Sequence, residues 1–68
     1  MGAPYLLQCW KTKARDTVQP FCIYSDSAAE LRERAEAILD GGEYRYLALS
    51  RWIPGPDCWE ERELFEAR

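Results

Sequence analysis

The hydrophobic pattern of this 68-residue chain changes its period twice. Residues 5–12 and 17–24 are rich in aromatic and apolar side chains over lengths typical of β-strands, and residues 44–53 alternate between two sets of side chains. Between these segments, residues 27–40 repeat apolar side chains at the spacing of an amphipathic helix. We therefore expect an α+β fold in which one helix packs on one face of a small sheet.

Both ends of the expected helix carry local signals. Ser27 followed by Glu30 is the capping-box pattern that begins a helix, and Gly41-Gly42 provides a left-handed residue that ends one. The helix is expected from about Ser27 to Asp40. Its apolar side and the strand residues facing it predict the core: Leu7, Cys9, Leu31, Ala35, Ile38, Leu47 and Leu49.

The three strands are expected to form an antiparallel sheet in the order 2-1-3. A right-handed crossover through the helix returns the third strand to the side of the first. Pro20 cannot donate a backbone hydrogen bond, which also places the second strand at an edge. A two-residue loop at 15–16 would put Cys9 opposite Cys22, although the absence of glycine at the turn leaves the register open to a longer loop.

The last segment has two interpretations. A Pro-Gly-Pro turn at 54–56 is followed by Asp57 and Glu60 in the capping-box pattern, and the glutamates after it favour a helix. The alternative is a fourth strand that runs back from the turn. The chain is thus predicted to be a single α+β domain, residues 1–68, in the order β-β-α-β-α, or with a fourth strand replacing the last helix.

The residue types present argue against catalysis. The chain has no histidine, which removes the imidazole base and the commonest metal ligand. Its three cysteines, Cys9, Cys22 and Cys58, are an odd number without a CxxC spacing. We expect reduced thiols, no catalytic residue, no metal and no cofactor.

Composition indicates the compartment. The chain is 47% hydrophobic, which is too apolar for a disordered tail, and 31% of its residues are charged, which is too many for a membrane span. Its net charge is -3. No apolar run approaches the length of a membrane-spanning helix, and the first residues lack the pattern of a signal peptide. The sequence therefore predicts a cytoplasmic protein without a membrane partner.

The sheet face away from the helix is the first candidate for binding. Strand alternation gives this face several aromatic side chains, which must be covered by something. The cover could be the terminal helix, a protein partner or a second copy of the chain, or nucleic-acid bases. The predicted partner-binding residues are Trp10, Tyr44, Tyr46, Trp52, Arg45 and Arg51.

Nucleic acid is the less favoured ligand of that face. Its phosphates would need a basic rim, and the candidates are Lys11, Lys13, Arg15, Arg45 and Arg51. The chain as a whole is acidic, however, and lacks the glycine-aromatic signature of RNA-recognition motifs. A protein-binding module is the preferred function, and a single-stranded nucleic-acid-binding module is the alternative.

The acidic side of the helix is the second candidate. Its carboxylates could imitate nucleic-acid phosphates and bind a basic groove of a nucleic-acid-binding protein. The alternative is an ordinary solvated surface, because Arg32 and Arg34 are interspersed among the acids. The residues concerned are Glu30, Glu33, Glu36 and Asp40.

Element order, short length and the Ser-Asp-Ser-Ala-Ala-Glu segment at 25–30 together resemble small phage and mobile-element accessory proteins, including anti-CRISPR inhibitors. This resemblance implies a single-domain protein that binds and blocks a larger host nucleoprotein complex, in the host cytoplasm if a phage encodes it. It carries no family-specific motif, so it assigns no role to any residue.

Overall fold

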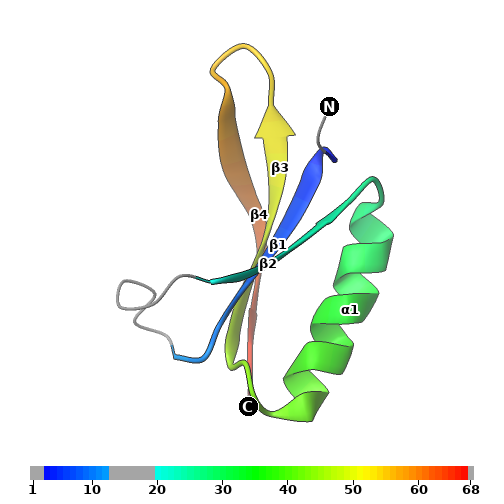
Figure 1. Cartoon of the computed structure of the whole chain (residues 1–68), viewed down its shortest axis with the longest axis vertical. Helices are drawn as coiled ribbons and strands as arrows, with labels where there is room; N and C mark the ends of the chain where they lie inside the picture. Colours follow the sequence, from blue (N-terminus) through cyan, green and yellow to red (C-terminus); the bar gives the residue numbers. More distant parts are fainter. Residues whose placement is uncertain (1–2, 13–19, 68) are drawn as a thin grey trace.

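The computed structural model, which describes residues 3–12 and 20–67, has one helix beside a four-stranded antiparallel sheet (Figure 1). The strands lie in the order β2-β1-β3-β4, so the predicted order 2-1-3 is confirmed and a fourth strand extends it. No helix of the described residues is both long and apolar enough to cross a membrane. The elements are β1 (Tyr5–Trp10), β2 (Phe21–Ser25), α1 (Ala28–Gly41), β3 (Tyr46–Ile53) and β4 (Cys58–Glu66).

Local hydrogen bonds define the ends of α1 much as predicted. The Ser27 hydroxyl accepts from the Glu30 backbone N–H at 3.2 Å. The Glu30 carboxylate, however, accepts from Ser25 Oγ at 3.2 Å, and that hydroxyl accepts from the Ser27 backbone N–H at 3.0 Å. Ser25 thus bridges the two parts of the capping box. At the other end Gly42 adopts a left-handed φ of 81° and donates to the Leu39 carbonyl.

The predicted terminal helix is wrong, and the alternative fourth strand is confirmed. Asp57 adopts φ 54°, whereas a residue that caps a helix start needs the extended backbone seen at Ser27. The four residues 54–57 instead turn the chain so that Cys58 pairs with Ile53. The resulting hairpin of β3 and β4 projects beyond the start of β1 (Figure 1).

A β-bulge interrupts the pairing of β3 with β4. Leu49 lies opposite Glu63 and Ser50 opposite Glu61, so Arg62 is the additional residue. Trp59 and Leu64 consequently share one face although their spacing is odd. The bulge also places Arg62 and Glu63 against the same cavity on the helix side of the sheet.

The predicted pairing of Cys9 with Cys22 is wrong by one residue. Cys9 lies opposite Phe21, and Cys22 lies opposite Gln8, which puts the two cysteines on different faces of the sheet. The predicted two-residue loop at 15–16 is outside the described residues.

The predicted core lies between α1 and the sheet. Helix α1 packs against β2, β1 and β3, and Ile38 packs at the margin of the buried cluster. Each fully buried leucine contributes about 1.5–3 kcal/mol to folding, so this small cluster is a substantial source of stability. Its fully buried members are Leu7, Cys9, Leu31, Ala35, Leu47 and Leu49.

Candidate protein-binding face

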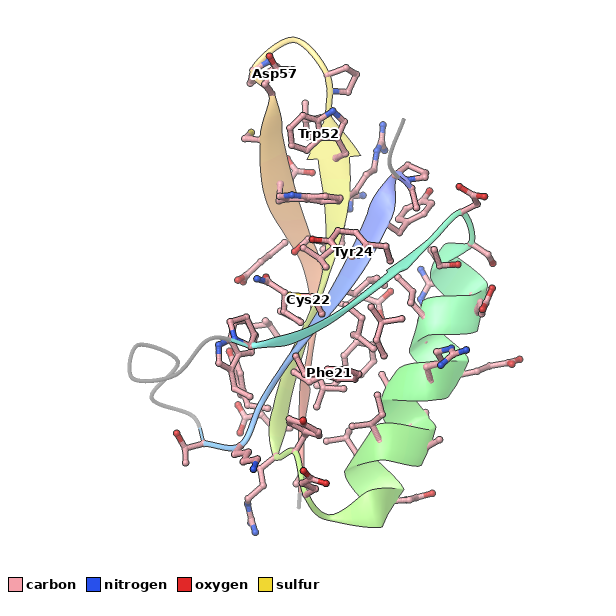
Figure 2. All side chains as sticks on the ribbon, viewed as in Figure 1. Phe21, Cys22, Tyr24, Trp52 and Asp57 are labelled. Atoms are coloured by element: carbon pink, nitrogen blue, oxygen red, sulfur yellow. The ribbon has the colours of Figure 1, made fainter. Side chains whose placement is uncertain are left out.

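The sheet face opposite α1 carries most of the aromatic side chains. No element of residues 3–12 and 20–67 packs over it (Figure 1). Figure 2 shows Tyr24 on β2 and Trp52 near the tip of the hairpin. We call this surface the aromatic face; it consists of Leu6, Trp10, Tyr24, Tyr46, Ala48, Ser50, Trp52, Trp59 and Leu64.

Aromatic rings cover smaller side chains at the centre of the aromatic face. The ring centroids of Tyr24 and Trp59 lie 6.0 Å apart, and the Trp52 ring meets that of Trp59 edge-on at 5.2 Å. Beneath them Leu6 and Ser50 are buried. The face therefore has a closed floor and an outer layer of aromatic groups.

Two of the predicted contact residues belong to the floor. Trp10 and Tyr46 contact each other at 6.1 Å between ring centroids, and only 9% and 6% of their surfaces are exposed. The apolar groups that reach solvent are Tyr24 at 57%, Leu64 at 54% and Trp59 at 36% exposure. Interface anchors must be accessible before binding, so the outer residues are the better candidates.

Sequence reasoning missed all three outer residues. Tyr24 has the same strand alternation as Cys22, but the predicted register put Cys22 on the helix side. Trp59 and Leu64 fall in the last segment, for which the capping-box pattern favours a terminal helix over a fourth strand. The apolar residues within the glutamate-rich segment were the available signal, and a β-bulge concealed their common face.

Tyr44 lies elsewhere than predicted. It precedes β3 and packs against the core on the helix side, where its ring stacks on Phe21 with centroids 5.7 Å apart and planes at 20°. The strand alternation predicted for residues 44–53 thus begins only at Tyr46. Phe21 remains half exposed at the margin of this stack.

The described residues of the predicted basic rim lie in more than one place. Lys11 and Arg45 line a cavity of about 330 Å³ together with Tyr46 and Glu66, at one end of the aromatic face. Arg51 lines a cavity beside the first turn of α1, and Arg45 lines another near the end of that helix. The Nζ atom of Lys11 lies 3.8 Å from Oε2 of Glu43. Lys13 and Arg15 are outside the described residues.

The charges that the strands do place on the aromatic face are negative. Glu61 lies opposite Ser50, and Glu66 lies opposite Tyr46, so their side chains share this side of the sheet. Within the described strands no lysine or arginine joins them. The described strands therefore supply no basic side chain to this face.

The acidic side of α1 is a separate surface. Glu30 lies 3.8 Å from Arg34, one turn along the helix. Glu36 and Asp40 line an open cavity of about 520 Å³ with Leu39 and Phe65 at its apolar wall. The four predicted carboxylates, Glu30, Glu33, Glu36 and Asp40, are all exposed. They lie on the helix and not beside the aromatic face.

Two of the three cysteines, Cys9 and Cys22, are poorly suited to act as nucleophiles. Burial, with a smaller contribution from nearby Cys22, raises the pKa of Cys9 to about 11, and burial also raises the pKa of Cys22. Both thiols are thus protonated at neutral pH. In the part of the chain that the structure describes, no three Cys, Asp or Glu side chains are grouped as metal ligands would be.

Comparisons with protein-family models, with curated proteins and with solved structures found no match. What this chain does must therefore be inferred from the chemistry of its own surfaces. Two of them, the aromatic face and the acidic side of α1, lie on opposite sides of the sheet.

Proposed function

We propose that this chain is a non-catalytic protein-binding module whose aromatic face contacts another protein. The observation that carries the proposal is the exposed apolar group formed by Tyr24, Trp59 and Leu64 on a supported floor. Tyrosine and tryptophan held in a fixed position lose little conformational entropy on binding and are enriched among residues that dominate interface energies. Such a surface suits a partner with an apolar patch.

The charges near this surface favour protein over nucleic acid. Binding of a single strand by stacking needs basic groups that follow the backbone. Here the described strands contribute Glu61 and Glu66 to the face, while Arg51 points to the opposite side. A phosphate chain laid across the aromatic rings would meet no basic side chain from the described strands.

The kind of partner follows from the resemblance to phage accessory proteins and from the acidic helix. A small inhibitor or modulator of a larger nucleoprotein complex, acting in the cytoplasm, is consistent with a protein that binds without catalysis. Glu33 and Glu36 on α1 are the alternative contact, because they would imitate nucleic-acid phosphates and bind a basic groove of such a complex.

A pair of matched variants tests which surface binds. Affinity capture from the source cell identifies a partner, whose Kd is then measured with wild type, with Trp59→Ala/Leu64→Gln and with Glu33→Lys/Glu36→Lys. We expect the aromatic-face variant to lose about 2 kcal/mol or more, roughly 30-fold in Kd. Thermal melting of each variant confirms that it is folded.

Four outcomes would contradict or redirect parts of this proposal. Unchanged affinity of the folded aromatic-face variant would exclude that face, and a loss confined to the helix variant would make the acidic side of α1 the binding surface. Micromolar binding of single-stranded RNA or DNA that weakens steeply with salt would favour the nucleic-acid alternative. A dimer in sedimentation that Trp59→Ala dissociates would identify a second copy as the partner.

A further inference from the structure

A cavity on the helix side of the sheet brings together three arginines from three elements. Arg32 comes from α1, Arg51 from β3 and Arg62 from β4, and the cavity between them has a volume of about 230 Å³. We call this site the arginine pocket. Its remaining lining residues are Tyr5, Ala28, Leu49 and Glu63.

Two of the guanidinium groups are held in place by carboxylates. Arg32 donates from Nε to Glu63 Oε1, and Arg62 donates from Nη1 to Glu60 Oε1 at 2.8 Å. Each guanidinium carries five N–H groups, so these bonds leave further donors on both side chains. The β-bulge gives Arg62 its position, because it is the residue without a partner on β3.

Arg51 is the least constrained of the three. Its side chain is exposed and makes no hydrogen bond or ion pair with another described residue. The site holds three positively charged guanidinium groups and two carboxylates, those of Glu60 and Glu63, so its local charge is positive. This excess of positive charge is local, because the chain as a whole is acidic.

We propose that the arginine pocket binds a single phosphoryl group. Planar guanidinium forks approaching from three elements can share the oxygens of a tetrahedral anion, whereas one fork already satisfies a planar carboxylate. The cavity is smaller than the range of about 300–1,000 Å³ typical of sites for whole small molecules, which favours recognition of one group. Partial exposure of the arginines implies weak, salt-sensitive affinity.

This proposal does not depend on the protein-binding function. The arginine pocket and the aromatic face lie on opposite sides of the sheet, so a substitution in one leaves the other intact. Either proposal can fail alone.

Titration followed by NMR tests the site. Inorganic phosphate, O-phosphoserine and AMP are added separately at constant ionic strength, with acetate as the carboxylate control. We expect saturable shifts of the Nε–H signals of Arg32 and Arg51 with the phosphoryl probes and at least about tenfold weaker binding of acetate. The tightest probe shows whether the group comes from the free anion, a phosphorylated side chain or a nucleotide.

Matched arginine variants connect the shifts to the pocket. Arg51→Gln should weaken phosphoryl binding at least about tenfold, and Arg51→Lys should bind with intermediate affinity because it keeps the charge without the fork. Arg34→Gln removes an arginine outside the pocket and should leave binding unchanged. Shifts that do not saturate, equal binding of acetate, or a folded Arg51→Gln variant with unchanged affinity would each overturn the proposal.

Discussion

The rings of Tyr24 and Trp59 lie 6.0 Å apart although their strands, β2 and β4, are the two opposite edges of the sheet. The contact passes over β1 and β3, whose residues Leu6 and Ser50 pair directly beneath it. The two rings cover Leu6 and Ser50, which explains why these residues are buried although no element packs over this face. Aromatic side chains from both edges take the place of a second layer.

The ring contact predicts an energetic coupling between the two edge strands. Tyr24→Ala and Trp59→Ala should each destabilise the protein, and the double variant should lose less than the sum of the two. The expected coupling is about 0.5–1.5 kcal/mol, the range for aromatic pairs. Urea unfolding of the four proteins in the cycle measures it, and strict additivity would show that the rings do not interact in solution.

Tyr46 and Leu64 should respond oppositely to truncation. Tyr46 is buried in the floor of the aromatic face, so Tyr46→Ala should lower the free energy of unfolding by about 3 kcal/mol, as core truncations do. Leu64 is 54% exposed, and Leu64→Ala should cost less than half as much. Chemical denaturation compares them, and equal losses would contradict the burial assigned to these residues.

The two glycines at the end of α1 offer a matched pair. Gly42 has φ 81°, where an added Cβ strains the backbone, so Gly42→Ala should destabilise by about 1 kcal/mol. Gly41 is helical and has open space around it, so Gly41→Ala should stabilise by about 0.5–1 kcal/mol. Thermal unfolding measures both melting temperatures. If both variants shift in the same direction relative to wild type, the helix does not end at Gly42 as described.

The buried thiol of Cys9 should make the protein less stable at alkaline pH. Its pKa is about 11 in the folded chain because of burial and then the nearby Cys22, against about 8.5–9 when unfolded. The unfolded state therefore releases this proton first. The protonated Cys9 thiol therefore makes its full contribution to the free energy of unfolding below about pH 9. This contribution is lost as the pH rises toward 11, by about 1.4 kcal/mol per pH unit.

Cys9→Ala isolates this effect from other groups that titrate in the same interval. The variant is less stable at neutral pH because it leaves a cavity, but its free energy of unfolding should fall less between pH 9 and 11. Urea unfolding at a series of pH values gives both slopes. Parallel pH profiles for wild type and variant would show that Cys9 does not contribute.

Short-range patterns in the sequence were sufficient for the helix and its core. The bonds that begin and end α1 join residues within five positions of each other, at Ser25 to Glu30 and at Leu39 to Gly42. Alternation alone identified Leu47 and Leu49 as facing the helix. Part of the aromatic face, Trp10, Tyr46 and Trp52, was found in the same way.

Tertiary structure decided what local patterns left open. Asp57 and Glu60 carry a helix-start pattern worth about 1 kcal/mol, but the segment after them forms β4 because it pairs along the length of β3. The meeting of Tyr24 with Trp59, and that of Arg32 with Arg51 and Arg62, join residues far apart in the chain. Such contacts depend on strand order, on register and on one bulge. All three are properties of the paired strands, so no short segment of the sequence determines them.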